Sequence, residues 1–189
     1  FGEDRENVAE KGIAFMKGME SAGVLSSGKH FPGHGDTATD SHHALPLINF
    51  SRNRLDSLEL YPFQRLIDGG LSSVMVAHLE VPALELQEGL PSSLSEQVIT
   101  GILKEEMCFE GLVFTDALNM KGVTESRKDG EAELAAFMAG NDILLMPTEI
   151  EKAITLGCQT LKFFPAATGG GLPFLKSVAA PYQHLDLKR

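Results

Sequence analysis

Two kinds of apolar pattern alternate along the chain. Short runs that are apolar on both faces predict strands buried within a parallel sheet. Between these runs, apolar residues recur at helical spacing, as over residues 4–22 and 98–103. Alternating strands and helices predict an α/β fold. The predicted strands are residues 74–77, 111–114, 142–146 and 160–164.

Two polar motifs predict where helices begin. Ser93 and Glu96 frame a capping box, in which each side chain binds the backbone N–H of the other residue. Thr148 and Glu151 frame a second one. We therefore expect one helix to begin at residue 93 and another at residue 148.

Polar or reactive residues follow the apolar runs. His78 follows the first run, Thr115–Asp116 the second and Pro147 the third, and Lys29–His30 end the segment before Phe31. In (β/α) barrels the active site is built at the carboxyl ends of the strands. One polar strand end would mark only the limit of a strand, but four in series favour a barrel enzyme.

Composition excludes several classes of protein. The chain has 189 residues, of which 43% are hydrophobic and 22% charged, and its formal net charge is −10. An acidic chain without clusters of Lys and Arg is not expected to bind nucleic acid or anionic membrane. No apolar run approaches the ~20 residues needed to span a bilayer, and no leader opens the chain, which favours the cytoplasm. Cys108 and Cys158 are expected to be buried free thiols.

Four of the six histidines lie within residues 30–43, a segment punctuated by glycine and proline. Histidine and aspartate are good metal ligands, but no specific ligand spacing occurs, so no catalytic metal is expected. Asp40 and His42 are near enough to pair, and a carboxylate would make the imidazole a stronger base and fix its tautomer. From the spacing alone, a solvated histidine beside a turn-forming aspartate is the simpler interpretation.

Asp116 is the second candidate centre, because it directly follows an apolar strand at the mouth of the predicted barrel. A carboxylate at that position has several uses. It could ligate a metal, act as a base, attack carbon, or merely cap the following turn.

Several motifs resemble the signature of glycoside hydrolase family 3, specifically its bacterial β-N-acetylglucosaminidase branch. The first is Lys29-His30-Phe31-Pro32-Gly33-His34-Gly35, followed by Asp40, Ser41 and His42. The resemblance is collinear over residues 1 to about 147. Its other matching stretches are residues 76–83, 91–95, 114–120 and 139–147.

The resemblance implies a role for each of these residues. Asp116 would be the nucleophile that forms a glycosyl-enzyme intermediate. His42, paired with Asp40, would be the general acid/base in place of the second carboxylate of the usual scheme. The substrate would be an amino-sugar glycan or glycopeptide, with no metal or cofactor. The implied substrate-binding residues are Lys29, His30, His34 and Met120.

The end of the chain resembles a different enzyme. Residues from about 148 to 184 resemble the class I 2-keto-3-deoxy-6-phosphogluconate aldolase, which makes Lys162 an alternative Schiff-base residue. The simpler interpretation of Lys162 is a barrel lysine paired with an acidic neighbour. The chain then looks like a chimera, with residues 1–147 hydrolase-like and residues 148–189 aldolase-like.

These observations together predict a single domain over residues 1–189. We expect a partial (β/α)8 TIM-type barrel of five or six strands, with residues 184–187 as the sixth. Open edges of such a sheet predict self-association or marginal stability. Three hypotheses remain at this point: a retaining β-N-acetylhexosaminidase, an aldolase that uses Lys162, and a non-catalytic barrel fragment.

Overall fold

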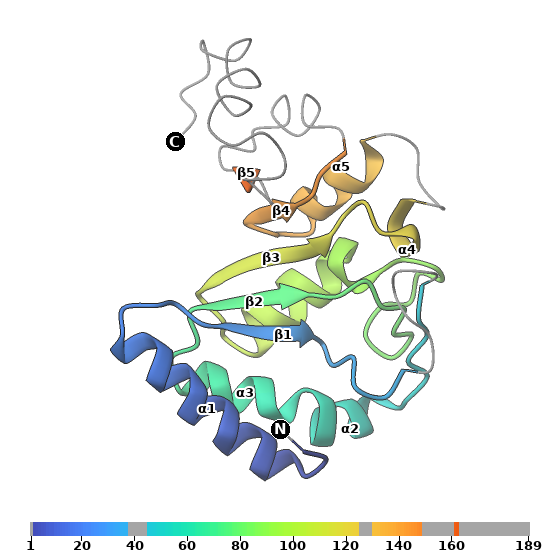
Figure 1. Ribbon diagram of the computed structural model, residues 1–189. Coiled ribbons are helices and arrows are strands. Elements are labelled where there is room, and N and C mark those ends of the chain that lie inside the picture. Colours follow the sequence, from blue (N-terminus) through green and yellow to red (C-terminus); the bar gives the residue numbers. More distant parts are fainter. Residues whose placement is uncertain (1, 38–44, 125–129, 149–160, 163–189) are drawn as a thin grey trace, which may run out of the picture.

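The computed structural model describes residues 2–37, 45–124, 130–148 and 161–162 (Figure 1). Strands and helices alternate along these residues, which is the order that the apolar pattern predicts. The strands are β1 (Ser27–Phe31), β2 (Ser73–Val76), β3 (Leu112–Ala117), β4 (Ile143–Leu145) and β5 (Leu161–Lys162). The helical elements are α1 (Arg5–Ser21), α2 (Arg52–Arg54), η1 (Leu55–Glu59), α3 (Tyr61–Asp68), η2 (Ser92–Leu94), η3 (Gln97–Glu106), α4 (Lys121–Thr124) and α5 (Glu131–Met138).

The five strands form one sheet in the order β1-β2-β3-β4-β5, and every neighbouring pair is parallel. Sequential parallel strands joined through helices are the repeating unit of a (β/α) barrel. The sheet thus confirms the α/β fold with a partial barrel. The sixth strand expected at residues 184–187 lies outside the described residues.

The first helix begins where the sequence predicts. The side chain of Asp4 accepts a hydrogen bond of 2.8 Å from the backbone N–H of Asn7, which makes Asp4 the N-cap of α1. Figure 1 shows α1 beside α3, both on the β1 side of the molecule.

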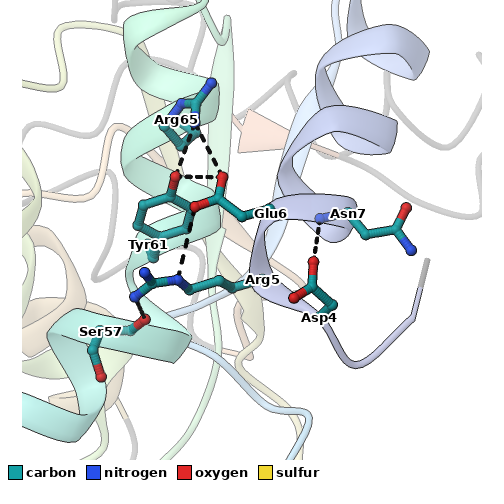
Figure 2. Close-up of polar contacts among 7 residues, drawn as sticks. All are labelled: Asp4, Arg5, Glu6, Asn7, Ser57, Tyr61 and Arg65. Carbon is teal, nitrogen blue, oxygen red and sulfur yellow. Dashed lines mark hydrogen bonds and ion pairs between the residues drawn. The ribbon is translucent and has the colours of Figure 1, made fainter.

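Polar side chains join α1 to α3 and to η1, which precedes α3 (Figure 2). The hydroxyl of Tyr61 donates to Glu6 (2.6 Å) and accepts from Arg65 (2.8 Å). Arg5 stacks over the Tyr61 ring and donates to the carbonyl oxygen of Ser57. These contacts fix the angle at which α1 lies against the helix that packs on β1.

The main core lies between the strands and the helices α1, α3 and η3. Its members are apolar and almost free of solvent contact, so their burial supplies the main driving force for folding. A smaller core lies under α5 and is formed by Leu94, Leu118, Val123, Ala132, Ala136 and Leu144. The main core includes Met16, Phe31, Phe63, Val74, Val76, Ile99, Ile102, Leu103 and Val113.

The capping box predicted at Ser93 is wrong by two residues. The hydroxyl of Ser95 accepts from the backbone N–H of Val98 (3.1 Å), and its carbonyl accepts from Ile99. Ser95 is therefore the N-cap of the helix that contains η3. Ser93 lies in the preceding 3-10 turn, where its hydroxyl contacts His78. Thr148 donates to Glu133, and the rest of the second capping box lies outside the described residues.

The thiol of Cys108 is free, as expected, but its predicted burial is wrong. Met107 and Phe109 point into the core on either side of it. Cys108 has a φ of 57°, and its side chain is exposed to solvent. Cys158 lies outside the described residues.

Within the described ranges, β1 and β5 form the two ends of the sheet. Self-association through such edges stays a prediction. In the same residues no helix is long and apolar enough to cross a lipid bilayer.

We expect replacement of Asp4 by alanine to destabilise the protein by about 1 kcal/mol, because an orphan N–H of α1 loses its acceptor. The free energy of unfolding from urea denaturation measures the loss. Glu10→Ala, at an exposed position within the same helix, is the matched control and should change stability by less than about 0.5 kcal/mol. Equal effects of the two substitutions would contradict the assignment of Asp4 as the cap.

Candidate active site

An extra residue interrupts the pairing of β1 with β2 at Lys29–His30. Gly28 pairs with Val74 and Phe31 with Val76, so β1 takes three steps where β2 takes two. Gly28 and Phe31 consequently both face Phe63 of α3. Strict alternation would place residues three apart on opposite faces. The extra residue leaves Lys29 and His30 outside this core, at the carboxyl end of β1.

The same irregularity occurs in β3 at Asp116. Phe114 pairs with Ile143 and Ala117 with Leu145, again three steps against two. The hydroxyl of Thr115 accepts from the backbone N–H of Leu145 (3.0 Å) and so fills the gap in the strand pairing. Such bulges redirect side chains and are common beside active sites. Here the bulge turns Asp116 out of the regular alternation.

The two bulges bring Asp116 and the Lys29–His30 pair to the same end of the sheet. Phe31, Val76 and Thr115 are register partners across β1, β2 and β3. His30 directly precedes Phe31 and Asp116 directly follows Thr115, so both candidate residues adjoin this row of paired residues. Burial lowers the pKa of His30 below its ordinary value of 6.5, while the negative charge of Asp116 acts in the opposite direction. The positive charges of Lys29 and His34 lower it further. His30 therefore meets a ligand at pH 7 as a neutral imidazole, with one donor and one acceptor.

His34 lies next to His30, with ring centroids 6.0 Å apart in an edge-to-face arrangement. Its Nδ1 is 2.7 Å from the hydroxyl of Thr37. The structure thus brings four predicted site residues near enough for their charges to interact, because Lys29, His34 and Asp116 all affect the pKa of His30.

The residues before and after segment 38–44 are anchored near the same end of the sheet. Before the segment, Arg54 donates to Asp36 (3.0 Å) and to Glu59 (2.9 Å). A Cβ on Gly33 would lie 2.8 Å from the Cβ of Glu59, and the φ of Gly33 is 136°. Only glycine suits both conditions. After the segment, the carbonyl of Pro46 accepts from the backbone N–H of Glu80.

Asp40 and His42 lie outside the described residues, so their pairing is not tested. Lys162 is in β5 with Leu145 as its register partner, and its side chain is likewise outside the described part. Met120 is buried after β3, and its backbone N–H donates to the carbonyl of Ala117. Its role in binding substrate stays a prediction. No group of three or more His, Cys, Asp or Glu side chains forms a metal site within the described residues.

His78 is the residue that sequence reasoning placed at a strand end but to which it gave no role in the site. It lies two positions beyond β2, and no part of it is exposed. Its Nε2 is 2.9 Å from the carbonyl oxygen of Ala117, directly after Asp116, and its Nδ1 is 2.6 Å from the hydroxyl of Ser93. Burial lowers its pKa, and the Ala117 carbonyl and Asp116 act in the opposite direction. The available signal was the Ser92–Ser93 pair, because hydroxyls that become buried need hydrogen-bond partners.

The sequence of the chain is similar to those of known glycoside hydrolases. Residues 1–164 match the glycosyl hydrolase family 3 N-terminal domain. The chain is 38% identical over 160 residues to a β-hexosaminidase A of Pseudoalteromonas piscicida, covering 79% of this chain and 27% of that protein. It is 36% identical over 153 residues to a β-hexosaminidase of Chromobacterium violaceum, covering 81% of this chain and 42% of that protein. The chain thus spans less than half the length of these relatives.

Solved structures agree with the sequence matches. A glycoside hydrolase family 3 β-N-acetylglucosaminidase from Paenibacillus sp. str. FPU-7 superposes with a TM-score of 0.76 at 42% identity, over 80% of this chain and 29% of that one. NagZ from Neisseria gonorrhoeae, in complex with N-trifluoroacetyl-D-glucosamine, superposes with a TM-score of 0.67 at 33% identity, over 80% and 42%. The chain therefore belongs to glycosyl hydrolase family 3, with residues 1–164 corresponding to its N-terminal domain.

Proposed function

We propose that this chain carries the reaction centre of a retaining β-N-acetylhexosaminidase. It removes terminal β-linked N-acetylglucosamine from amino-sugar glycans or glycopeptides. The observation that carries the proposal is the place of Asp116. Its carboxylate lies at the bulged end of β3, within electrostatic reach of His30, in a chain whose relatives are named β-hexosaminidases.

In this proposal Asp116 is the nucleophile. One carboxylate oxygen attacks the anomeric carbon, and the bond from that carbon to the leaving-group oxygen breaks. His42 gives its proton to the leaving oxygen. Water then attacks the same carbon and gives a proton to His42, and the ester bond to Asp116 breaks. Two displacements at one carbon return the original configuration.

Asp40 and His42 supply the acid/base function because a neighbouring carboxylate makes an imidazole a stronger base and fixes its tautomer. The anchored ends of segment 38–44 support this role. The segment leaves from Thr37, which bonds His34 beyond β1, and returns at Pro46, which pairs with Glu80 beyond β2. Both ends adjoin the strands that flank the candidate site.

Lys29 and His30 bind sugar hydroxyls in the proposal, and His34 and Met120 complete the substrate-binding set. The neutral state of His30 suits this task, since a hydroxyl both donates and accepts hydrogen bonds. Lys29 supplies a charged donor from the same bulge.

Aldolase chemistry at Lys162 and the aldolase-like identity of residues 148–189 stay predictions. The match to the hydrolase family extends to residue 164 and so includes Lys162. No observation on the described residues favours the aldolase. Borohydride trapping with pyruvate, followed by mass measurement of the peptide that contains Lys162, tests it directly.

We expect the purified chain to hydrolyse 4-nitrophenyl N-acetyl-β-D-glucosaminide, and Asp116→Asn to lower kcat by at least about a thousandfold, because the amide is a poor nucleophile. Asp68→Asn, at an exposed carboxylate of α3, should keep normal turnover. Release of 4-nitrophenol measures both. A cooperatively folded chain without turnover would contradict the proposal and favour the non-catalytic fragment.

Leaving-group dependence tests the acid/base. With His42→Ala, cleavage of chitobiose should fall at least about a hundredfold, because the departing sugar oxygen needs a proton. Formation of the glycosyl-enzyme from the 2,4-dinitrophenyl glycoside should change little, since that leaving group departs as an anion. Burst kinetics measures this step. His43→Ala is the matched control, and the assignment fails if it behaves like His42→Ala or if both substrates lose equally.

A further inference from the structure

We propose that His78 is a positioning residue that holds the Asp116 carboxylate through the backbone of Ala117. The proposal rests on the proposed function, in which Asp116 is the nucleophile. His78 would not touch the substrate. It would limit the range of orientations that the Asp116 carboxylate can adopt.

The contacts of His78 define which ring nitrogen carries the proton. A carbonyl oxygen only accepts hydrogen bonds, so Nε2, 2.9 Å from the oxygen of Ala117, is the donor. Burial disfavours the charged ring, so Nδ1 is unprotonated and accepts from the hydroxyl of Ser93 at 2.6 Å. Ser93 thereby selects the tautomer that can hold Ala117.

Ser93 is itself held in place from two sides. Asn141, which is 4% exposed, donates from Nδ2 to the carbonyl of Ser93 (2.9 Å) and to that of Ala136 (2.7 Å). Ser92 donates to the carbonyl of Ala77 (2.9 Å). The turn that carries Ser93 is therefore tied both to α5 and to the segment that precedes His78.

The network ends at the carboxylate of Asp116. The backbone N–H of Ala117 donates to Oδ1 of Asp116 at 2.8 Å. The next N–H, that of Leu118, donates to Leu145 of β4 at 2.9 Å. The carbonyl of Ala117 accepts both from Nε2 of His78 and from the backbone N–H of Met120 (3.1 Å), so His78 adds a side-chain donor to a bond within the turn. Rotation of the segment would move Oδ1, so the His78 bond limits the orientation of the carboxylate.

The expected effect follows from the sensitivity of displacement reactions to geometry. A misplacement of about 1 Å in a reacting group costs on the order of a hundredfold in rate. Loss of the His78 bond should lower kcat and leave KM nearly unchanged, because Lys29 and His30 lie on β1 and do not depend on this network. A general loosening of the fold would change both constants.

Two substitutions separate the loss of the hydrogen bond from the loss of side-chain volume at position 78. His78→Gln places an amide N–H near the position of Nε2 and keeps the donor to Ala117, whereas His78→Leu removes it. We expect kcat to fall less than about fivefold for His78→Gln and about ten- to a hundredfold for His78→Leu, with KM within about twofold in each. Ile102→Val, a buried change in η3, is the control for lost stability and should leave kcat unchanged. Equal losses of kcat in both His78 variants would overturn the proposal.

Amide hydrogen exchange of the full chain tests the network independently of turnover. Exchange at Ala117 and Leu118 should be at least about tenfold faster in His78→Leu than in wild type, and nearly normal in His78→Gln. Nitrogen-15 NMR of the imidazole should show a neutral ring protonated at Nε2. Unchanged exchange in His78→Leu, or a ring protonated at Nδ1, would overturn the network even where turnover is normal. Absent turnover in wild type with the expected exchange would instead overturn the proposed function alone.

Discussion

The parallel pairing of β1, β2 and β3 is the constraint on which the candidate site depends. The pairing of β2 with β3 is regular over four residues, whereas β1 and β3 each contain one extra residue near their carboxyl ends. A regular strand would alternate its side chains between core and opposite face. In β1 the bulge takes Lys29 and His30 out of that alternation while Gly28 and Phe31 stay buried. In β3 it leaves Thr115 buried and Asp116 half-buried. Lys29–His30 and Thr115–Asp116 reach the same end of the sheet for this reason.

Burial of polar groups explains the second feature of the site. His78, Ser93 and Asn141 are enclosed by apolar side chains, and an unpaired polar group there would cost about 1–3 kcal/mol. His78, Ser93 and the Nδ2 of Asn141 each bond another member of the set or a backbone carbonyl, whereas the Oδ1 of Asn141 has no partner among the described residues. One of these carbonyls belongs to Ala117, which directly follows Asp116. The hydrogen bond that satisfies the buried His78 therefore also restrains the backbone beside Asp116.

The local charge at the site differs from that of the whole chain. The protein carries a formal net charge of −10, yet Lys29, His30 and His34 lie beside the carboxylate of Asp116. Burial and positive neighbours keep His30 neutral at pH 7. Within the described residues, this group offers hydrogen-bond donors and acceptors around the carboxylate of Asp116.

The sequence by itself determined the class of fold, because apolar runs report strands that are buried on both faces. All four predicted runs and the segment before Phe31 correspond to strands of one parallel sheet. The sequence also determined a helix over about residues 4–22 and Asp116 as a residue at the end of a strand. These are local properties, set by neighbours within a few positions. The resemblance to known motifs also predicted the family, which is confirmed, whereas the roles it implies for the residues stay predictions.

Only the tertiary structure decided the bulges, the true N-cap at Ser95 and the network of His78. A bulge depends on the register of a distant partner strand, as with Gly28 opposite Val74 and Phe114 opposite Ile143, so it leaves no periodic pattern in the sequence. Ser93 satisfies the pattern of a capping box, but a buried imidazole competes for its hydroxyl. Cys108 lies outside the core because its backbone turns between two buried neighbours. In each case the outcome depended on which distant group was available, and one sequence read along its length does not contain that information.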